Sequence, residues 1–253
     1  MPQPVVELLF LPTPLELDRL RMVLVDTRNP LNLGAAARAM SNFGVLHLRV
    51  VNPYDPSFRE ARSAVGPSAE VLANAEQFES LAGAVADCVL VVGTTAIQHR
   101  ELQHPTKRPD QAAMQILAQL LTANVAIVFG SEKTGLSNDD LSHCHWLMHI
   151  PARNGHLSMN LGQAVAVTLY EVVRESQPQA LTDREEPATA AELERITTVL
   201  LEALRISGYT TPATLAATEE KARRMVRRMG LSPRDAEVLL GMLRQMLWKL
   251  RTP

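Results

Sequence analysis

Short, almost purely apolar runs alternate with helical patterns as far as Glu175, and this alternation limits what the chain can fold into. The runs predict β-strands at Met22–Val25, His47–Val51, Val89–Gly93, Val125–Phe129 and Leu147–Ile150. Helices are expected between them at Asn32–Phe43, Ala69–Asn74, Ser80–Ala86, Asp110–Leu121 and Asn138–Cys144, and after them at Met159–Glu175. Strands that are apolar on both faces are typical of parallel sheets covered by helices. The alternation therefore predicts an α/β domain with a mostly parallel sheet.

The pattern changes at Ser176–Pro187, a polar segment with prolines that is typical of a linker. Only helical patterns follow, and they predict helices at Ala190–Gly208, Thr218–Met229 and Pro233–Arg251. Gly208 and Gly230 would end the first two helices, and Ser232 with Pro233 would begin the third. The expected organisation is an N-terminal extension at 1–17, an α/β domain at 18–175, a linker at 176–189 and a small all-helical extension at 190–253.

The composition is that of an ordinary soluble globular protein, with 46% hydrophobic and 21% charged residues. A net charge of −2 excludes nucleic-acid binding through bulk charge, so only a local basic patch could bind it. Cys88 and Cys144 lie in or beside apolar runs and are expected to be reduced core thiols of a cytoplasmic protein. The apolar run at residues 5–11 is short and contains Glu7, so no signal peptide or membrane span is expected.

Two familiar ligand-binding patterns are incomplete. Gly130 and Gly135 have the spacing of a phosphate loop, but Leu136 stands where that loop needs Lys, and no dinucleotide fingerprint is present. His143-Cys144-His145 could suggest zinc, but no further ligands stand at metal spacing, so no metal is expected. What remains is a glycine-hinged loop at the end of a strand, whose backbone groups could recognise an adenine edge or a ribose without charge.

Polar residues stand at the starts of two predicted helices. Asn32 is expected to cap the first helix, and Arg38 is the only charge in its first two turns. Arg38 is either a solvated surface residue or a group directed at a phosphate or a developing oxyanion. Ser158 is expected to cap the helix that begins near Met159, with Asn160 in its first turn. Capping is compatible with ligand contact, because helix N-termini offer unpaired donors.

Three segments together resemble the motifs of the SPOUT superfamily, SpoU/TrmH class. They are Asn32-x-Gly-x-x-x-Arg38, Phe129-Gly-x-Glu132-x-x-Gly135-Leu136-Ser137, and Ile150-Pro followed by Ser158-x-Asn160-Leu161. Members of this class are S-adenosylmethionine-dependent RNA ribose 2′-O-methyltransferases. The resemblance covers about Arg21 to Glu175, and the helical extension points more closely to the TrmJ type, which methylates cytidine or uridine in tRNA.

The resemblance implies a homodimer whose α/β domain ends in a deep trefoil knot, a rare exception to unknotted topology. It implies S-adenosyl-L-methionine as cofactor and tRNA as partner, with a pyrimidine of the anticodon loop as the modified nucleotide. Implied cofactor contacts are Thr94, Thr95, Ala96, Gly130, Gly135, Leu136, Ile150, Leu157, Ser158 and Met159. Catalytic roles carry over to Arg38 and Ser158, with Glu132, Asn160 and Asn32 in support.

The chain departs from the family pattern in two places. The third motif often reads Ser-Ser-Leu-Asn, and here Leu157 replaces the first Ser, so any contact there could use only its backbone. The stretch Ile97–Arg100 also lacks the expected arginines, which puts RNA contacts there in doubt.

The expected chemistry is in-line methyl transfer to a ribose 2′-hydroxyl, which must be oriented while its proton leaves. Because free Arg has a pKa above 12, Arg38 is better suited to stabilise the nascent alkoxide and a neighbouring phosphate than to act as a base. Ser158 would hydrogen-bond the ribose or relay the proton. Besides Arg38, the expected RNA contacts are the basic residues Lys221, Arg223, Arg224, Arg227 and Arg228. They belong to a wider basic surface of the helical extension that also includes Arg234, Arg244, Lys249 and Arg251. A merely solvated helix face is the alternative. Aromatic residues make up only 4%, so base stacking is expected to be minor.

Three other functions stay open at this point. The chain could be an rRNA 2′-O-methyltransferase of the same class. It could be an inactive RNA-binding protein with this fold, although the intact Arg38, Glu132 and Asn160 argue against that. It could also be an α/β enzyme with a different adenine-containing cofactor, which the missing phosphate loops disfavour.

Overall fold

A computed structural model of the chain describes residues 17–54, 66, 68–96, 104–153, 159–174 and 187–252. The strands are β1 Leu20–Val25, β2 His47–Val51, β3 Glu76–Phe78, β4 Cys88–Thr95, β5 Thr106–Lys107, β6 Asn124–Phe129 and β7 Trp146–His149. The helices of the first domain are α2 Pro30–Asn42, α4 Ser68–Ala73, α5 Leu81–Ala84, α6 Pro109–Leu120, α7 Asn138–Ser142 and α8 Leu161–Arg174. Those of the C-terminal part are α9 Ala190–Ile206, α10 Leu215–Arg228 and α11 Pro233–Arg251.

Within the described residues, the strands form one parallel sheet in the order β3-β2-β1-β6-β4-β7-β5. β1 lies between β2 and β6, so that Met22 is level with Leu48 on one side and Ile127 on the other. The chain runs outward from β1 to β3 and then resumes at β4 on the far side of β1. This change of direction is the position where open α/β sheets bind ligands, beyond the carboxyl ends of the strands.

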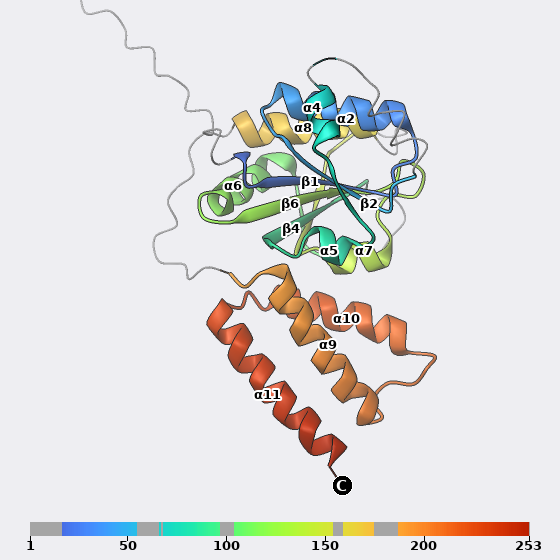
Figure 1. The fold of residues 1–253 in the computed structure, drawn as a ribbon, viewed down its shortest axis with the longest axis vertical. Helices are drawn as coiled ribbons and strands as arrows, with labels where there is room; N and C mark the ends of the chain where they lie inside the picture. Colours follow the sequence, from blue (N-terminus) through green and yellow to red (C-terminus); the bar gives the residue numbers. More distant parts are fainter. Residues whose placement is uncertain are drawn as a thin grey trace, which may run out of the picture.

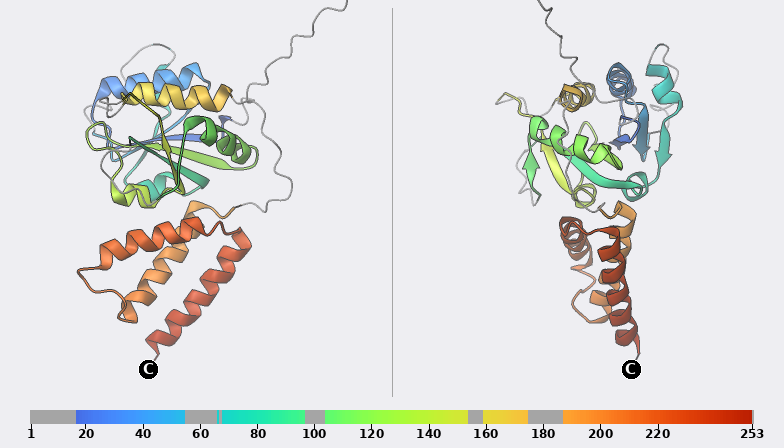
Figure 2. Two further views of the ribbon diagram at one scale, coloured as in Figure 1. Left: turned by 180° about the vertical axis from the view of Figure 1, so that it is seen from behind. Right: turned by 90° about the vertical axis from the view of Figure 1, so that its left-hand side faces the viewer.

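Helices cover both faces of the sheet, as the apolar strands predict (Figure 1). Met22 and Leu24 of β1 face the core under α2, α6 and α8, whereas Val23 and Val25 face the core formed with α5 and α7. The alternation of side chains along each strand therefore supplies both cores. Figure 2 shows α2 and α8 side by side above the sheet and the C-terminal helices below it.

The predicted strands are all present, but the strands at the two edges of the sheet were missed. β3 is the segment Glu76-Gln77-Phe78, in which only Phe78 is partly buried, and β5 has only two residues. Each pairs on one side only, β3 with β2 and β5 with β7. Such edge strands need no continuous apolar run, so hydrophobic periodicity cannot reveal them.

The C-terminal helices form a small unit with its own core, which includes Leu193, Ile196 and Val226. The predicted caps are confirmed, because Ser232 accepts from the backbone N–H of Asp235 with Pro233 at the first helical position. Gly208 and Gly230 follow α9 and α10 with φ of +79° and +62°, in the left-handed region that favours glycine. The boundary at 176–189 stays a prediction, because residues 175–186 lie outside the described ones.

Three further expectations concern segments that are only partly described. The N-terminal extension at 1–17 is described only at Leu17, which is buried in the larger core. The trefoil knot would involve Ile150–Asn160, of which residues 154–158 lie outside the described part, so the knot stays a prediction. Among the helices that the structure describes, none is both long enough and apolar enough to cross a membrane.

Candidate active site

A chain of hydrogen bonds joins polar residues from three distant segments at the carboxyl edge of the sheet. The Asn32 side-chain N–H donates to Glu132 Oε1 at 3.0 Å, and the Asn160 side-chain N–H donates to Asn32 Oδ1 at 2.8 Å. The other oxygen of Glu132 accepts from the backbone N–H of Arg28 at 3.5 Å. Asn32 follows β1, Glu132 follows β6, and Asn160 precedes α8. The three sequence motifs therefore meet in one place.

Asn32 is available for this network because it does not cap its helix, contrary to the sequence-based expectation. Asn29 is the N-cap of α2, its side-chain oxygen accepting from the backbone N–H of Leu31 at 2.9 Å, and Pro30 occupies the first helical position. The prediction was wrong because both Asn29 and Asn32 are good capping residues, and the proline favours a start at the first of them. Asn32 then lies within the first turn, with both ends of its amide bonded across the site.

Asn160 combines the two roles that the sequence could not separate. Its side-chain oxygen accepts from the backbone N–H of Gly162 at 3.0 Å, which caps the start of α8, while its N–H group reaches Asn32. Asn160 was expected inside the first turn, but α8 begins at Leu161. The contacts predicted for Leu157 and Ser158 lie outside the described residues.

Close packing of α2 against α8 holds this arrangement. A Cβ atom added at Gly162 would lie 2.5 Å from the Ala35 Cβ, a distance that real side chains do not tolerate. The small residues of both helices therefore set how near Asn32 and Asn160 can come. The motif glycine Gly34 is different, since an added Cβ there would meet nothing within 4 Å.

The loop that carries Glu132 is closed by its two glycines. Ser131 and Gly135 form an antiparallel bridge in which the Gly135 N–H donates to the Ser131 carbonyl at 2.8 Å. Gly135 has a φ of +69°, and a Cβ at Gly130 would lie 2.2 Å from the Gly135 carbonyl carbon. Both positions thus require glycine, one for its backbone conformation and one for space. Leu136 is buried against Gly93 beneath the loop, where a Cβ on Gly93 would approach it to 3.3 Å.

The predicted cofactor loops lie together at the ends of neighbouring strands. β4 lies between β6 and β7, so Thr94, Thr95, Ala96, Gly130 and Ile150 stand at one edge of the sheet. The Thr94 hydroxyl donates to the Val128 carbonyl at 3.0 Å, and His149 Nδ1 lies 3.1 Å from the Thr95 carbonyl. Met159, the last of the implied contacts inside the described part, is half-buried.

The chemistry of these residues fits an uncharged adenosine and a positively charged centre better than a phosphate. The loops offer hydroxyl, amide and carbonyl groups. Glu132 lies within the glycine-hinged loop, and Asp139 and Asp140 occupy the first turn of α7 directly after it. Negative charges at these places repel phosphate. S-adenosylmethionine, a sulfonium without phosphate, is compatible with them, whereas the phosphates of NAD and ATP are disfavoured.

Arg38 is exposed on α2, six residues after Asn32 and one turn beyond Ala35, which packs against α8. Among the described residues its guanidinium has no hydrogen-bond or ion-pair partner. An exposed and uncommitted cation on the helix that carries Asn32 is available to an anionic ligand. Its catalytic role stays a prediction.

The two cysteines and His143 are buried, and His145 is half-buried beside them. Both thiols are free and buried, and burial raises the pKa of Cys88 and of Cys144 to about 12. His145 Nδ1 accepts from the backbone N–H of Val91 at 3.0 Å, and burial lowers the pKa of this imidazole to about 3. The thiols are therefore protonated at neutral pH and His145 is neutral, and their role is in packing.

The basic residues expected to bind RNA fall into two groups. Arg223 and Arg227 are only 5% and 3% exposed, and Arg224 is also buried, whereas Lys221 and Arg228 are exposed. Arg223 donates to Asp139 at 3.0 Å, to the Ser142 hydroxyl at 2.9 Å and to Glu194 at 3.2 Å, which ties α10 to α7 and α9. Arg227 lies 3.4 Å from the same Glu194. These two arginines contribute to the contact between the domains, so the patch is smaller than the sequence suggests.

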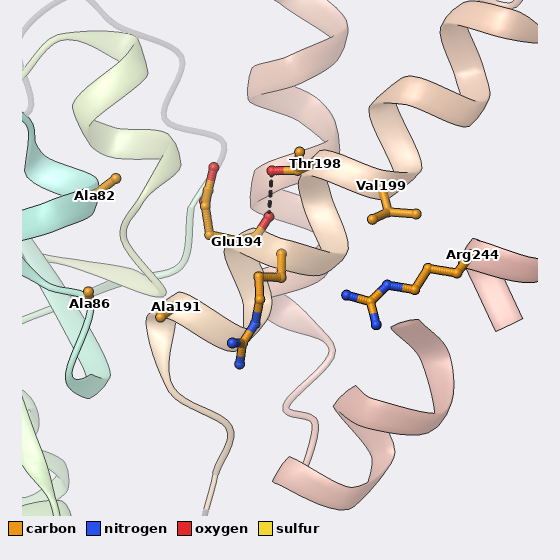
Figure 3. Close-up of a pocket in the computed structure, with 8 residues that line it drawn as sticks. Ala82, Ala86, Ala191, Glu194, Thr198, Val199 and Arg244 are labelled. Carbon is orange, nitrogen blue, oxygen red and sulfur yellow. Dashed lines mark hydrogen bonds between the residues drawn. The ribbon is translucent and has the colours of Figure 1, made fainter. Parts of the chain in front are cut away.

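A groove of about 370 Å³ lies between the α/β domain, near α5, and the C-terminal helices α9 and α11. Ala82 and Ala86 line it from the first domain, and Arg195, Thr198 and Arg244 line it from α9 and α11. Figure 3 shows Arg244 reaching from α11 toward α9, where the Thr198 hydroxyl donates to the Glu194 carbonyl. The groove is lined by none of the predicted cofactor residues. Both of its arginines are exposed, and Arg244 belongs to the predicted basic surface whereas Arg195 does not.

Comparisons with known proteins agree with this geometry. The model of the SpoU rRNA Methylase family matches residues 19–170. The chain is 34% identical over 232 residues to tRNA (cytidine/uridine-2'-O-)-methyltransferase TrmJ of Sodalis glossinidius (strain morsitans), covering 90% of this chain and 91% of that protein. It is also 34% identical over 234 residues to the protein of the same name from Klebsiella pneumoniae subsp. pneumoniae, at 90% and 96% coverage.

A solved structure extends the likeness to the C-terminal helices. The crystal structure of TrmJ from Z. mobilis ZM4 superposes with a TM-score of 0.79 at 32% identity, and the match covers 89% of this chain and 98% of that one. Family model, relatives and fold all support the same assignment. The chain belongs to the SpoU methylase family.

Proposed function

We propose that this protein transfers the methyl group of S-adenosylmethionine to the ribose 2′-hydroxyl of a cytidine or uridine in tRNA. The observation that carries the proposal is the hydrogen-bond chain through Asn160, Asn32 and Glu132, which joins the three motifs of the family at one edge of the sheet. The relatives that share about 90% of the chain's length are tRNA (cytidine/uridine-2'-O-)-methyltransferases, which supports this substrate over rRNA.

The cofactor would lie against the loops that follow β4, β6 and β7. Thr95, Ala96 and Ile150 are at least partly accessible there, and Gly130 and Gly135 shape the loop between them. When bound, S-adenosylmethionine supplies an electrophilic methyl group. The protein's part is to orient the ribose hydroxyl and to stabilise the charge that develops on its oxygen as the proton leaves.

Arg38 is the residue proposed to stabilise that charge. The bound cofactor would supply the methyl group that replaces the hydroxyl proton of the ribose, and that proton would pass to water, either directly or relayed through the Ser158 hydroxyl. Arg38 would act through its positive charge and its N–H donors, because a guanidinium offers donors and no acceptor. Asn32 and Asn160 are positioning residues that hold Glu132 and the start of α8 in place. Such preorganised polar groups act without rearrangement during the reaction.

We propose that tRNA docks on exposed basic residues of the C-terminal helices. Lys221 and Arg228 remain candidates from the predicted set, and Arg195 and Arg244 add positive charge at the groove between the domains. The homodimer, the knot and a cytoplasmic location are further parts of the proposal. They rest on family membership, because a knotted domain with its site near a dimer interface is what the family resemblance implies.

Methylation assays on unmodified tRNA and rRNA transcripts test the proposal. With labelled S-adenosylmethionine, we expect label in tRNA only, mapped to a ribose of the anticodon loop, and loss of label with Arg38→Ala. Label in rRNA alone would instead support an rRNA 2′-O-methyltransferase of the same class. Binding of tRNA without label under any condition would support an inactive RNA-binding protein. Calorimetry against NAD and ATP would expose a different adenine cofactor.

A further inference from the structure

Beside the hydrogen-bond network, an arginine and a tyrosine form an exposed pair that the family motifs do not include. The Arg28 guanidinium carbon lies 5.8 Å from the centroid of the Tyr54 ring, within the range of a cation–π contact. Arg28 is exposed, and 49% of Tyr54 is accessible. The backbone N–H of Arg28 donates to Glu132, which also accepts from Asn32. The pair is thus joined directly to the proposed site.

Arg28 and Tyr54 occupy equivalent positions beyond the ends of two neighbouring strands. β1 and β2 end level with each other at Val25 and Val51, and Arg28 and Tyr54 each follow three residues later. The residues immediately after the strands, Asp26 and Asn52, have φ of +52° and +47°. The Asn52 side-chain N–H donates to the Asp26 carboxylate at 2.6 Å. One polar clamp therefore turns both chains at the same level and brings Arg28 over Tyr54.

The clamp combines left-handed backbone with a buried hydroxyl that lacks a partner among the described residues. Asp26 and Asn52 are the described non-glycine residues that adopt the left-handed conformation. Between Asp26 and Arg28, the fully buried Thr27 hydroxyl has no hydrogen-bond partner among the described residues. Strained backbone and unsatisfied polar groups persist where the surrounding structure fixes them, and they concentrate at functional sites.

We infer that Arg28 and Tyr54 form a stacking platform for one base of the RNA substrate, next to the ribose that is methylated. This inference rests on the proposed function. An aromatic ring stacks on any base, and a guanidinium beside it attracts the adjoining phosphate. Such a platform provides affinity without hydrogen bonds that distinguish cytosine from uracil. The platform therefore suits an enzyme that methylates both cytidine and uridine. A single exposed tyrosine is sufficient to stack on one base, so the low aromatic content of the chain is compatible with it.

Steady-state kinetics of the full-length protein with tRNA and S-adenosylmethionine test the platform. For Tyr54→Ala we expect the KM for tRNA to rise roughly 10-fold or more, by about the same factor for cytidine and uridine substrates, with cofactor affinity unchanged. Tyr54→Phe should retain the wild-type KM, because the ring remains. Tyr170→Ala is the matched control, since Tyr170 is 54% exposed and lies on α8 ten residues, roughly 15 Å, beyond Asn160.

Equal KM values for Tyr54→Ala and Tyr170→Ala would overturn the inference. The inference would also be overturned if Tyr54→Phe raised the KM for tRNA as much as Tyr54→Ala does, or if Tyr54→Ala also weakened cofactor binding. Either result would assign Tyr54 a structural role. A loss confined to one of the two pyrimidines would also overturn it, since stacking does not discriminate between them. If the wild-type protein methylates no tRNA, the proposed function fails instead, and that result is visible before any variant is compared.

Discussion

Asn29 and Asn32 lie three residues apart in one helix, and the structure gives them different functions. Asn29 closes the helix start through the Leu31 N–H, whereas Asn32 connects Glu132 to Asn160. Residue type alone cannot predict which asparagine has which role, because both are asparagines near the start of the same helix. Their separation makes a paired experiment possible, in which one variant affects folding and the other affects turnover.

We predict that Asn32→Ala lowers kcat strongly while cofactor affinity stays within a few fold, because the variant removes a positioning contact outside the cofactor loops. Asn29→Ala should lower the free energy of unfolding by about 1 kcal/mol, the usual value of an N-cap, and leave kcat near wild type. Denaturant titration and single-turnover rates measure the two effects. Wild-type turnover in Asn32→Ala would remove the hydrogen-bond chain from the mechanism.

Glycine substitutions on the facing helices should have opposite signs. Gly162→Ala places a methyl group 2.5 Å from the Ala35 Cβ and should destabilise the protein by about 1–3 kcal/mol. Gly34→Ala meets nothing within 4 Å, and replacing a helical glycine should stabilise the protein by about 0.5–1 kcal/mol. Thermal unfolding measures whether Gly162→Ala melts below, and Gly34→Ala above, the wild-type protein. A stabilised Gly162→Ala protein would show that the helices are less closely packed than described.

At the scale of elements, Arg49 joins β2 to β3 and to the segment before β4. It donates to Glu76 at 2.8 Å, to the Ala84 carbonyl at 2.8 Å and to Asp87 at 3.0 Å. Burial alone would raise the pKa of the Asp87 carboxyl, but hydrogen bonds and charge from Arg49 outweigh it and lower the pKa to about 2. The folded state therefore favours the ionised carboxylate.

The pH dependence of stability follows from this shift. A carboxyl whose pKa is lowered on folding stabilises the protein above its unfolded pKa, near 3.8, and this contribution disappears as the pH falls toward 2. Asp87→Asn should cost about 1 kcal/mol at pH 7, allowing for solvent screening of the half-exposed carboxylate. The difference from wild type should shrink between pH 4 and pH 2. Chemical denaturation across that range measures it, and a constant difference would contradict the assignment.

At the scale of the whole molecule, the C-terminal helices, which we propose as the docking surface for tRNA, also cover one face of the α/β domain. Ala190 belongs to the core under the sheet, and the Ala191 N–H donates to the Ala86 carbonyl at 3.2 Å. Arg223 fastens α10 to α7, which directly follows the glycine-hinged loop. The simple view of an independent extension on a linker therefore understates the contact between the domains.

We predict that a protein ending near Gln177 still binds S-adenosylmethionine, but with a lower melting temperature and weaker tRNA binding. For each tRNA phosphate that the shortened protein no longer neutralises, the slope of log affinity against log salt should become shallower by roughly 0.7–0.9. The double variant Arg195→Ala, Arg244→Ala in the full chain is the matched comparison, because it removes charge without uncovering the core. Equal tRNA affinity and slope in all three proteins would place RNA recognition in the α/β domain alone.

The amino-acid sequence alone predicts the chain order of the inner strands and the helices, the parallel sheet, most helix boundaries and the three motifs, because these depend on local periodicity, turn residues and spacing. It could not determine the edge strands β3 and β5, which carry no apolar run. Nor could it assign the cap of α2 to Asn29 and the bridge to Asn32, or show that Arg223 and Arg227 are buried while Lys221 and Arg228 are not. Those properties depend on which distant carboxylates and amides come within hydrogen-bond distance, and only the folded chain brings Glu132, Asn160 and Glu194 to their partners.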